Sequence, residues 1–188
     1  MRIGILGGTF NPIHLGHLIL AEEARQKLKL DKVIFVPTYL PPHKDNKEIA
    51  PAQDRLKMVK LAIKNNPYFS VSDIEIRRKG RSYTIDTLRE FKRIMPSDEL
   101  YFIIGSDLLN YLNEWKDLDE ILKMVNFIVA TRPDYPLDKL PPHITTLPIR
   151  AVDISGYQIR QAIKQKHSFR YLVPEKVFKY ITKRGLYR

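Results

Sequence analysis

Residues 4–18, GILGGTFNPIHLGHL, decide the fold of this chain. The apolar run 2–6 predicts a strand, which ends at the glycine pair Gly7 and Gly8. Apolar residues then recur at helical spacing, at Leu18, Ala21, Ala24 and Leu28. The β-branched run KVIFVPT (32–38), closed by proline, predicts a second strand. A strand, a helix and a strand within about 35 residues match a βαβ unit with two parallel strands.

Strands and helices continue to alternate along the rest of the chain. The expected helices are 52–66, 85–95 with Thr84 and Asp86 as caps, 106–125 with an interruption around Trp115, 155–165 and 174–184. The other expected strands are 69–76, 100–105, 126–131 and 144–150, with a turn at 77–82 and Pro-rich loops at 39–51 and 132–143. This alternation predicts an α/β fold, a doubly wound Rossmann-like parallel sheet with flanking helices. We expect one domain over 1–188, on which a small C-terminal helical segment (about 155–188) packs.

Four polar loops follow the predicted strands, with the sequences GGTFNP, PTYLPPHK, GSD and TRP. In doubly wound sheets the ligands bind beyond the carboxyl ends of the strands. We therefore expect these loops to converge on one edge of the sheet and to hold the functional site.

The composition narrows the class of protein. The chain has 188 residues and no cysteine, which excludes disulfides, zinc–thiolate sites and cysteine nucleophiles. No apolar run approaches the ~20 residues of a membrane span, and the N-terminus does not read as a signal peptide, so we expect a cytoplasmic protein without a membrane partner. The net charge is +11, but the basic residues are scattered along the chain. We therefore expect no nucleic-acid partner.

The turn at Gly7 and Gly8 suits a phosphate ligand. Glycines allow the backbone to approach a ligand closely, and the helix that follows points free N–H groups and a positive dipole end toward it. His14 and His17, three residues apart at the helix start, are expected on one helix face, and Gly16 leaves room for a flat group over the helix. As hydrogen-bond donors, two imidazoles can stabilise charge that develops on phosphoryl oxygens.

Two alternatives for the histidines stay open on this reasoning. A zinc site lacks a third ligand nearby, and the zinc-binding helix motif uses a spacing of four with a glutamate inside. Two histidines that only pack or cap the helix are the plainer alternative.

The stretch GGTFNPIHLGH (7–17) resembles the nucleotidyltransferase signature G-[GS]-[TS]-F-[DN]-P-x-H-x-G-H. Other stretches, in order over essentially the whole chain, resemble the bacterial nicotinate-nucleotide adenylyltransferases: VPTYLPPHK (36–44), SYTIDTL (82–88), GSD (105–107) followed by Trp115, and LVPEKVFKYITKRGLY (172–187). The resemblance implies that AMP moves from ATP to the 5′-phosphate of nicotinate mononucleotide, which gives deamido-NAD and pyrophosphate. Because that phosphate is already an anion near neutral pH, no protein nucleophile or strong general base is required.

The resemblance also implies roles for individual residues. It assigns catalysis to His14, His17 and Arg160, with His17 as the strongest contact in the transition state. It assigns ATP binding to Gly7, Gly8, Thr9, Phe10, Gly105, Ser106, Arg132, Ile154 and Ser155. It assigns binding of nicotinate mononucleotide to Lys44, Thr84, Asp107, Tyr111 and Trp115. Mg²⁺ is expected on the triphosphate of ATP, without a dedicated protein metal site. Whether the chain forms a homo-oligomer is left open.

Several of these residues have a plainer interpretation. Lys44 can also be read as a solvated loop lysine, Trp115 as a core residue and Asp107 as a helix cap. Arg132 can also be read as the partner of a neighbouring acid.

One stretch departs from the family pattern. Where the family carries I-S-S-T-x-[IV]-R, this chain has ISGYQIR (154–160), so Gly156 and Tyr157 replace a serine and a threonine. Backbone N–H groups at a helix start still hold phosphate without those hydroxyls, so we expect weaker or rearranged triphosphate contacts.

Rival functions are disfavoured by particular residues. A phosphopantetheine adenylyltransferase has a threonine at the place of His14 and lacks SYTIDTL, and the class I aminoacyl-tRNA synthetases need a lysine-rich second loop. A basic nucleic-acid-binding module needs aromatic and basic residues interleaved on one sheet face. The choice between nicotinate and nicotinamide mononucleotide stays open.

Overall fold

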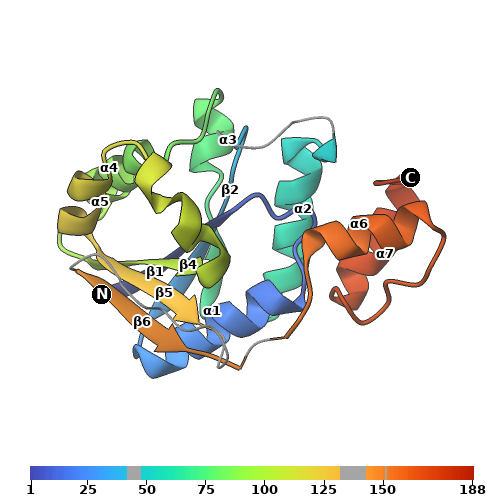
Figure 1. The fold of residues 1–188 in the computed structure, drawn as a ribbon, viewed down its shortest axis with the longest axis horizontal. Coiled ribbons are helices and arrows are strands. Elements are labelled where there is room, and N and C mark those ends of the chain that lie inside the picture. The colour runs from blue at the N-terminus through green and yellow to red at the C-terminus, as the bar shows by residue number, and fades with distance from the viewer. Residues whose placement is uncertain (42–47, 132–142, 151) are drawn as a thin grey trace.

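Six parallel strands form one sheet at the centre of the protein (Figure 1). The computed structural model describes residues 1–41, 48–131, 143–150 and 152–188. The strands are β1 (Arg2–Gly8), β2 (Lys32–Pro37), β3 (Phe69–Val71), β4 (Glu99–Gly105), β5 (Asn126–Thr131) and β6 (Ile144–Pro148). They lie in the order β3-β2-β1-β4-β5-β6, and all neighbouring pairs are parallel. The predicted doubly wound parallel sheet is confirmed.

Helices cover both faces of the sheet. One face carries α1 (Leu15–Lys27), α2 (Ala52–Ile63), α6 (Gly156–Lys164) and α7 (Glu175–Arg184). The other carries α3 (Ile74–Arg78), α4 (Thr84–Ile94), the 3₁₀ helix η2 (Ser106–Glu114) and α5 (Leu118–Met124). Successive strand residues point to opposite faces, so Leu6 and Phe35 pack in the first core while Ile5 and Ile34 pack in the second. Burial on both faces explains why the strands read as continuous apolar runs.

The C-terminal helices pack on the rest of the chain through α2. Val177 and Ile181 of α7 are buried in the same apolar cluster as Met58 of α2. The Tyr180 hydroxyl donates a hydrogen bond to Asp54 of α2 at 2.7 Å. In Figure 1, α6 and α7 lie to one side of the sheet, next to α2.

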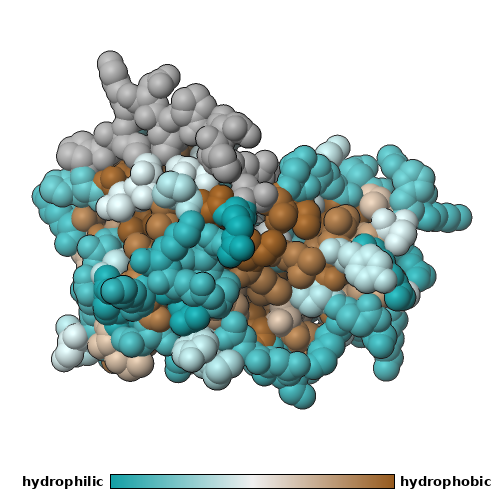
Figure 2. Space-filling model, turned by 90° about the horizontal axis from the view of Figure 1, so that it is seen from below, coloured by the Kyte–Doolittle hydropathy of each residue, from teal (hydrophilic) through white to brown (hydrophobic). Residues whose placement is uncertain are grey.

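The face of the protein that points downward in Figure 1 carries both polar and apolar side chains. Polar side chains cover most of it, and apolar side chains reach it near its middle (Figure 2). Within the described ranges, no helix combines the length and the apolar character that a membrane span requires.

The winding of the sheet reverses between β1 and β4. The chain proceeds from β1 to β2 and β3 on one side, and from β4 to β5 and β6 on the other. Ligands of doubly wound sheets bind at the carboxyl ends of the strands at such a reversal. Gly7 and Gly8 are the last residues of β1, and Gly105 is the last residue of β4, so residues 9–12 and 106–107 leave the sheet from neighbouring strands.

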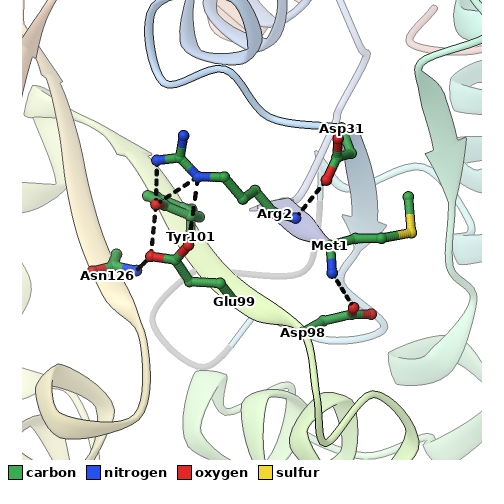
Figure 3. Close-up of polar contacts among 7 residues, drawn as sticks. All are labelled: Met1, Arg2, Asp31, Asp98, Glu99, Tyr101 and Asn126. Carbon is green, nitrogen blue, oxygen red and sulfur yellow. Dashed lines mark hydrogen bonds and ion pairs between the residues drawn. The ribbon is translucent and has the colours of Figure 1, made fainter.

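The opposite edge of the sheet carries a connected set of polar groups (Figure 3). This amino-edge network consists of Met1, Arg2, Asp31, Asp98, Glu99, Tyr101 and Asn126. At its centre the Tyr101 hydroxyl accepts a hydrogen bond from Arg2 Nε at 3.0 Å and donates one to Glu99 at 2.7 Å. The amino ends of β1, β4 and β5 are thus joined by their own side chains.

Two local predictions are wrong. The strand expected over 69–76 is only Phe69–Val71, and Ile74–Arg78 forms α3 instead. The period-two alternation was too short to separate a strand from a single helical turn, and three successive residues of that turn are buried. Thr84 does not cap α4 but is its first residue, because the chain is still extended at Tyr83, with φ of −82° and ψ of 134°.

Candidate active site

The turn after β1 contains an unfavourable backbone conformation. Phe10 has a φ of 48°, in the left-handed region that residues with a Cβ rarely occupy. Such residues cost of order 1–3 kcal/mol and persist where their surroundings over-determine them. Here the Phe10 ring is 2% exposed, and its centroid lies 5.0 Å from that of the His17 imidazole and 5.8 Å from that of Phe35. The burial of one aromatic ring thus fixes both the turn and the imidazole beside it.

The two histidines lie together at the start of α1, as predicted. Their ring centroids are 3.7 Å apart and their planes meet at 30°. The backbone N–H of His14 donates to Nδ1 of His17 at 3.2 Å, so a neutral His17 ring carries its proton on Nε2. Gly16 permits this arrangement, because a Cβ there would lie 3.1 Å from Nδ1 of His14. The flat group over Gly16 is therefore the His14 imidazole itself.

His14 is held in its neutral form. Its side chain is buried, and this burial lowers its pKa from 6.5 to about 4. Its Nδ1 atom is buried and has no hydrogen-bond partner. Because native proteins rarely leave a buried polar atom unpaired, this atom calls for an explanation such as a ligand or a functional role.

The start of α6 packs directly on the turn and on α1. A Cβ on Gly156 would lie 2.8 Å from the carbonyl oxygen of Asn11, so this close approach requires a glycine. The carbonyl oxygen of Ile154 lies 3.7 Å from the place where a Cβ of Gly16 would stand. The departure at Gly156 therefore brings the two helix starts together.

Ser155 is the N-cap of α6. Its hydroxyl accepts a hydrogen bond from the backbone N–H of Gln158 at 3.2 Å, and its own N–H donates to the Gln158 side chain at 2.8 Å. The hydroxyl that the resemblance assigns to ATP thus already satisfies a helix end.

Arg160 reaches from α6 to the same turn. Its Nη1 donates to the carbonyl oxygen of Asn11 at 2.9 Å, and its Nη2 lies 3.6 Å from Glu48. The side chain is only 15% exposed, and its Nε is buried without a partner. A cation is therefore held behind the turn, with one N–H group unused.

Sequence reasoning missed two residues that hydrogen-bond the loops at the carboxyl edge of the sheet to one another. The Asn11 side chain donates to the carbonyl of Glu48 at 2.9 Å and accepts from the N–H of Ala50 at 3.0 Å. Arg55 of α2 is 1% exposed and donates to three carbonyl oxygens, those of Thr9 at 2.7 Å, Tyr39 at 2.9 Å and Ala50 at 2.9 Å. A signal for Arg55 was present, because Met58 and Val59 at +3 and +4 place it on the buried face of α2.

Thr38 is a third residue that sequence reasoning missed. It follows β2 at the same edge of the sheet, and its N–H donates to the carbonyl of Gly8 at 3.0 Å. Its hydroxyl is buried without a hydrogen-bond partner. It is a further polar group available beside the turn.

Residues assigned to ATP (Gly105 and Ser106) and to nicotinate mononucleotide (Thr84, Asp107 and Tyr111) lie at the end of β4, in η2 and at the start of α4. Gly105 ends β4, Ser106 is buried, and the exposed Asp107 lies over Gly105, with Oδ1 2.6 Å from the place of a Cβ there. Tyr111 of η2 is 52% exposed. Thr84 opens α4, whose N-cap residue Tyr83 makes no side-chain cap hydrogen bond.

Trp115 is partly buried against the second core. Its ring centroid lies 6.0 Å from that of Phe102 and 6.1 Å from that of Phe127. Its neighbour Lys116 stands 5.2 Å from the centroid of the Tyr83 ring, which precedes Thr84. The two segments assigned to the second substrate are thus in contact.

Two of the predicted site residues, Lys44 and Arg132, lie outside the described residues. Within the described ranges, no group of three or more His, Cys, Asp or Glu side chains could hold a metal ion. The donor set at this edge consists of imidazoles, arginines, hydroxyls and backbone N–H groups, which suits phosphate oxygens.

Comparisons with known proteins identify the family of this chain. Residues 5–162 match the model of the cytidylyltransferase-like family. The chain is 44% identical over 187 residues to a probable nicotinate-nucleotide adenylyltransferase of Enterococcus faecalis, a match that covers all of this chain and 85% of that protein. It is 45% identical over 188 residues to the protein of the same name from Thermus thermophilus, with both chains covered completely.

A solved structure shares the fold. The nicotinic acid mononucleotide adenylyltransferase of Plasmodium falciparum, complexed with NaAD, superposes with a TM-score of 0.82 at 21% identity. The match covers 99% of this chain and 97% of that one.

Proposed function

The chain belongs to the cytidylyltransferase-like family, among the nicotinate-nucleotide adenylyltransferases, and from this premise we propose that it transfers AMP from ATP to nicotinate mononucleotide. The products are deamido-NAD and pyrophosphate. The observation that carries the proposal is the pair of stacked imidazoles at the start of α1, one with an unpaired buried nitrogen, beside a turn that ends a central strand.

The chemistry is an in-line attack of the acceptor phosphate on the α-phosphorus of ATP. The bond from that phosphorus to the pyrophosphate oxygen breaks, and pyrophosphate leaves as an anion. The protein then has to position both substrates and stabilise charge, without a nucleophile of its own. The Nε2–H of His17 is the donor best supported for this role, because its Nδ1 is already engaged by the His14 backbone.

The start of α6 supplies the second set of donors for the triphosphate. The backbone N–H groups of Gly156 and Tyr157 open a helix whose positive end favours an anion. Arg160 adds a cation behind them. The hydroxyl missing at Gly156 is then offset by a closer approach of the backbone, which only glycine allows there.

The acceptor binds at the other side of the reversal point. The uncapped start of α4 at Thr84 would receive the nicotinate carboxylate, since free N–H groups and a helix dipole favour an anion there. Trp115 would stack on the pyridine ring, Tyr111 would help to hold the carboxylate, and Asp107 would face the ribose. Lys44, for nicotinate mononucleotide, and Arg132, for ATP, complete the proposed set on the sequence resemblance alone.

Mg²⁺ enters this proposal with ATP. It would be coordinated mainly by phosphate oxygens and water. When bound, it neutralises charge on the triphosphate. The protein residues then bind the phosphates from outside that ion.

The test is pyrophosphate release from ATP and Mg²⁺ with either nicotinate or nicotinamide mononucleotide, with the dinucleotide product identified by mass. The proposal predicts rapid release with the nicotinate form and formation of deamido-NAD. Equal rates with both acceptors would remove the nicotinate assignment. No release with either acceptor would refute the function.

A further inference from the structure

Arg55 is the most deeply buried charged residue around the candidate site, and the reaction described above does not use it. It comes from α2, it is 1% exposed, and its three hydrogen bonds within the described residues all go to backbone carbonyl oxygens. Burying a charge is costly unless its donors are satisfied. A residue kept at that cost has a structural or functional reason.

The three carbonyls belong to three different segments of the carboxyl edge. Nη1 holds Thr9 in the turn after β1, Nη2 holds Tyr39 after β2, and Nε holds Ala50 just before α2. The planar fork of a guanidinium can satisfy such diverging acceptors at once, whereas a lysine ammonium offers its donors from a single atom.

The bond to Thr9 acts on the strained residue of the turn. Thr9 precedes Phe10, whose left-handed backbone has to be held in place by its surroundings. Arg160 holds the carbonyl on the other side of Phe10, that of Asn11, at 2.9 Å. Arginines from two helices thus donate hydrogen bonds to the backbone on both sides of Phe10. The Phe10 ring packs on His17.

We propose that Arg55 is a positioning residue, which fixes the turn at Thr9 and Phe10 and thereby aims the His17 imidazole at the reacting phosphate. It touches neither substrate. Its effect on the rate rests on the proposed function, but its effect on the imidazole does not.

The test compares Arg55→Lys with Arg25→Lys. Arg25 is a matched control, because its side chain is only 19% exposed. It donates a hydrogen bond to Glu22, which lies in the same helix, α1. For Arg55→Lys we expect kcat to fall roughly 10- to 100-fold, with the KM for ATP changed less than about threefold, because misplacement of a reacting geometry acts on the chemical step. Arg25→Lys should keep kcat within about twofold of wild type.

A second readout follows the imidazoles directly. In protein labelled with ¹⁵N-histidine, the chain gives signals from five residues, and His14→Gln and His17→Gln variants assign two of them. Arg55→Lys should shift the His17 ring nitrogens, and Arg25→Lys should leave them in place. If Arg55→Lys does not fold, Arg55→Gln, which removes the buried charge but keeps an N–H₂ donor, carries the same expectation.

The outcomes separate the two claims. A kcat for Arg55→Lys within twofold of Arg25→Lys, or unchanged His17 signals, would overturn the positioning role. Wild-type protein that releases no pyrophosphate with either acceptor would overturn the proposed function, and the His17 signals would still decide the role of Arg55.

Discussion

The two edges of the sheet differ in how their polar groups are paired, and of the amino-edge network only Tyr101 is buried. At the amino edge, the network of Figure 3 pairs its members with one another, so that Tyr101 is both acceptor and donor. At the carboxyl edge, buried atoms of His14, Thr38 and Arg160 have no hydrogen-bond partner. Within the described residues, the other two such atoms belong to Glu75 and Tyr187, and neither is at the amino edge. Three of the five unpaired buried atoms in the described ranges thus lie at the edge where we propose that the substrates bind, whereas the side chains of the amino edge are paired with one another.

The largest effect should follow from removing a donor at the carboxyl edge. His17→Ala loses the Nε2–H group, and we expect kcat for pyrophosphate release to fall roughly 10²- to 10³-fold, the cost of one donor to a developing charge. Thermal unfolding serves as the folding check. The matched change at the amino edge, Asn126→Ala, should leave kcat within about twofold. Equal losses in both variants would remove the distinction between the edges.

The second largest effect should appear in the free energy of unfolding as the pH is lowered. His14 has a folded pKa of about 4 against 6.5, so the unfolded chain binds the proton first as the pH falls. The contribution of neutral His14 to the free energy of unfolding is intact above pH 6.5. It is lost between pH 6.5 and 4, in total by roughly 3 kcal/mol. Urea unfolding of wild type and His14→Gln at pH 7, 5 and 4 measures the difference. Parallel curves would show that His14 takes up its proton as easily when folded.

The amino edge has its own, lower pH window. The hydrogen bond from Tyr101 holds the pKa of Glu99 below its usual 4.5. The contribution of ionised Glu99 to the free energy of unfolding is therefore present above pH 4.5. It is lost as the pH falls through the lower pKa of the folded state.

A smaller effect is expected at Gly156, where the chain departs from its family pattern. A Cβ there would press on the Asn11 carbonyl at 2.8 Å, so Gly156→Ala and Gly156→Ser should both lose about 1–3 kcal/mol of stability by overpacking. Both should also raise the KM for ATP, because the α6 start moves away from the turn. Urea unfolding and initial rates give the two numbers. If the serine variant binds ATP more tightly than wild type, the lost hydroxyl matters more than the close approach.

The smallest effect should come from within the amino-edge network. Tyr101→Phe removes the hydroxyl that joins Arg2 to Glu99, and we expect a loss of about 1 kcal/mol in the free energy of unfolding. Its kcat should match that of wild type. A large fall in kcat would instead connect this edge to the chemistry.

Most of the fold could be predicted from local pattern. The apolar strands are buried on both faces, so they read as plain runs, and the helices between them kept their periodicity. The prediction is wrong at Ile74–Arg78, where five residues carry too little pattern to tell a helix from a strand. Start positions such as Thr84 depend on backbone angles that composition does not determine.

The site was only half predictable, for a physical reason. His14 and His17 lie next to their turn in the sequence, so the motif and the geometry coincide. Arg55 and Asn11 act on carbonyls 46 and 37 residues away, and the identity of those acceptors follows only from the folded chain. Backbone acceptors have no residue type, so no sequence motif marks them.

One measurement tests the contrast between the edges most directly. A non-hydrolysable ATP analogue with Mg²⁺ is titrated into ¹⁵N-labelled protein, and the backbone amide signals are followed. The account predicts shifts at Thr9, His17 and Gly156, with Arg2, Glu99 and Asn126 unchanged. Shifts confined to the amino edge, or spread evenly over both edges, would contradict it.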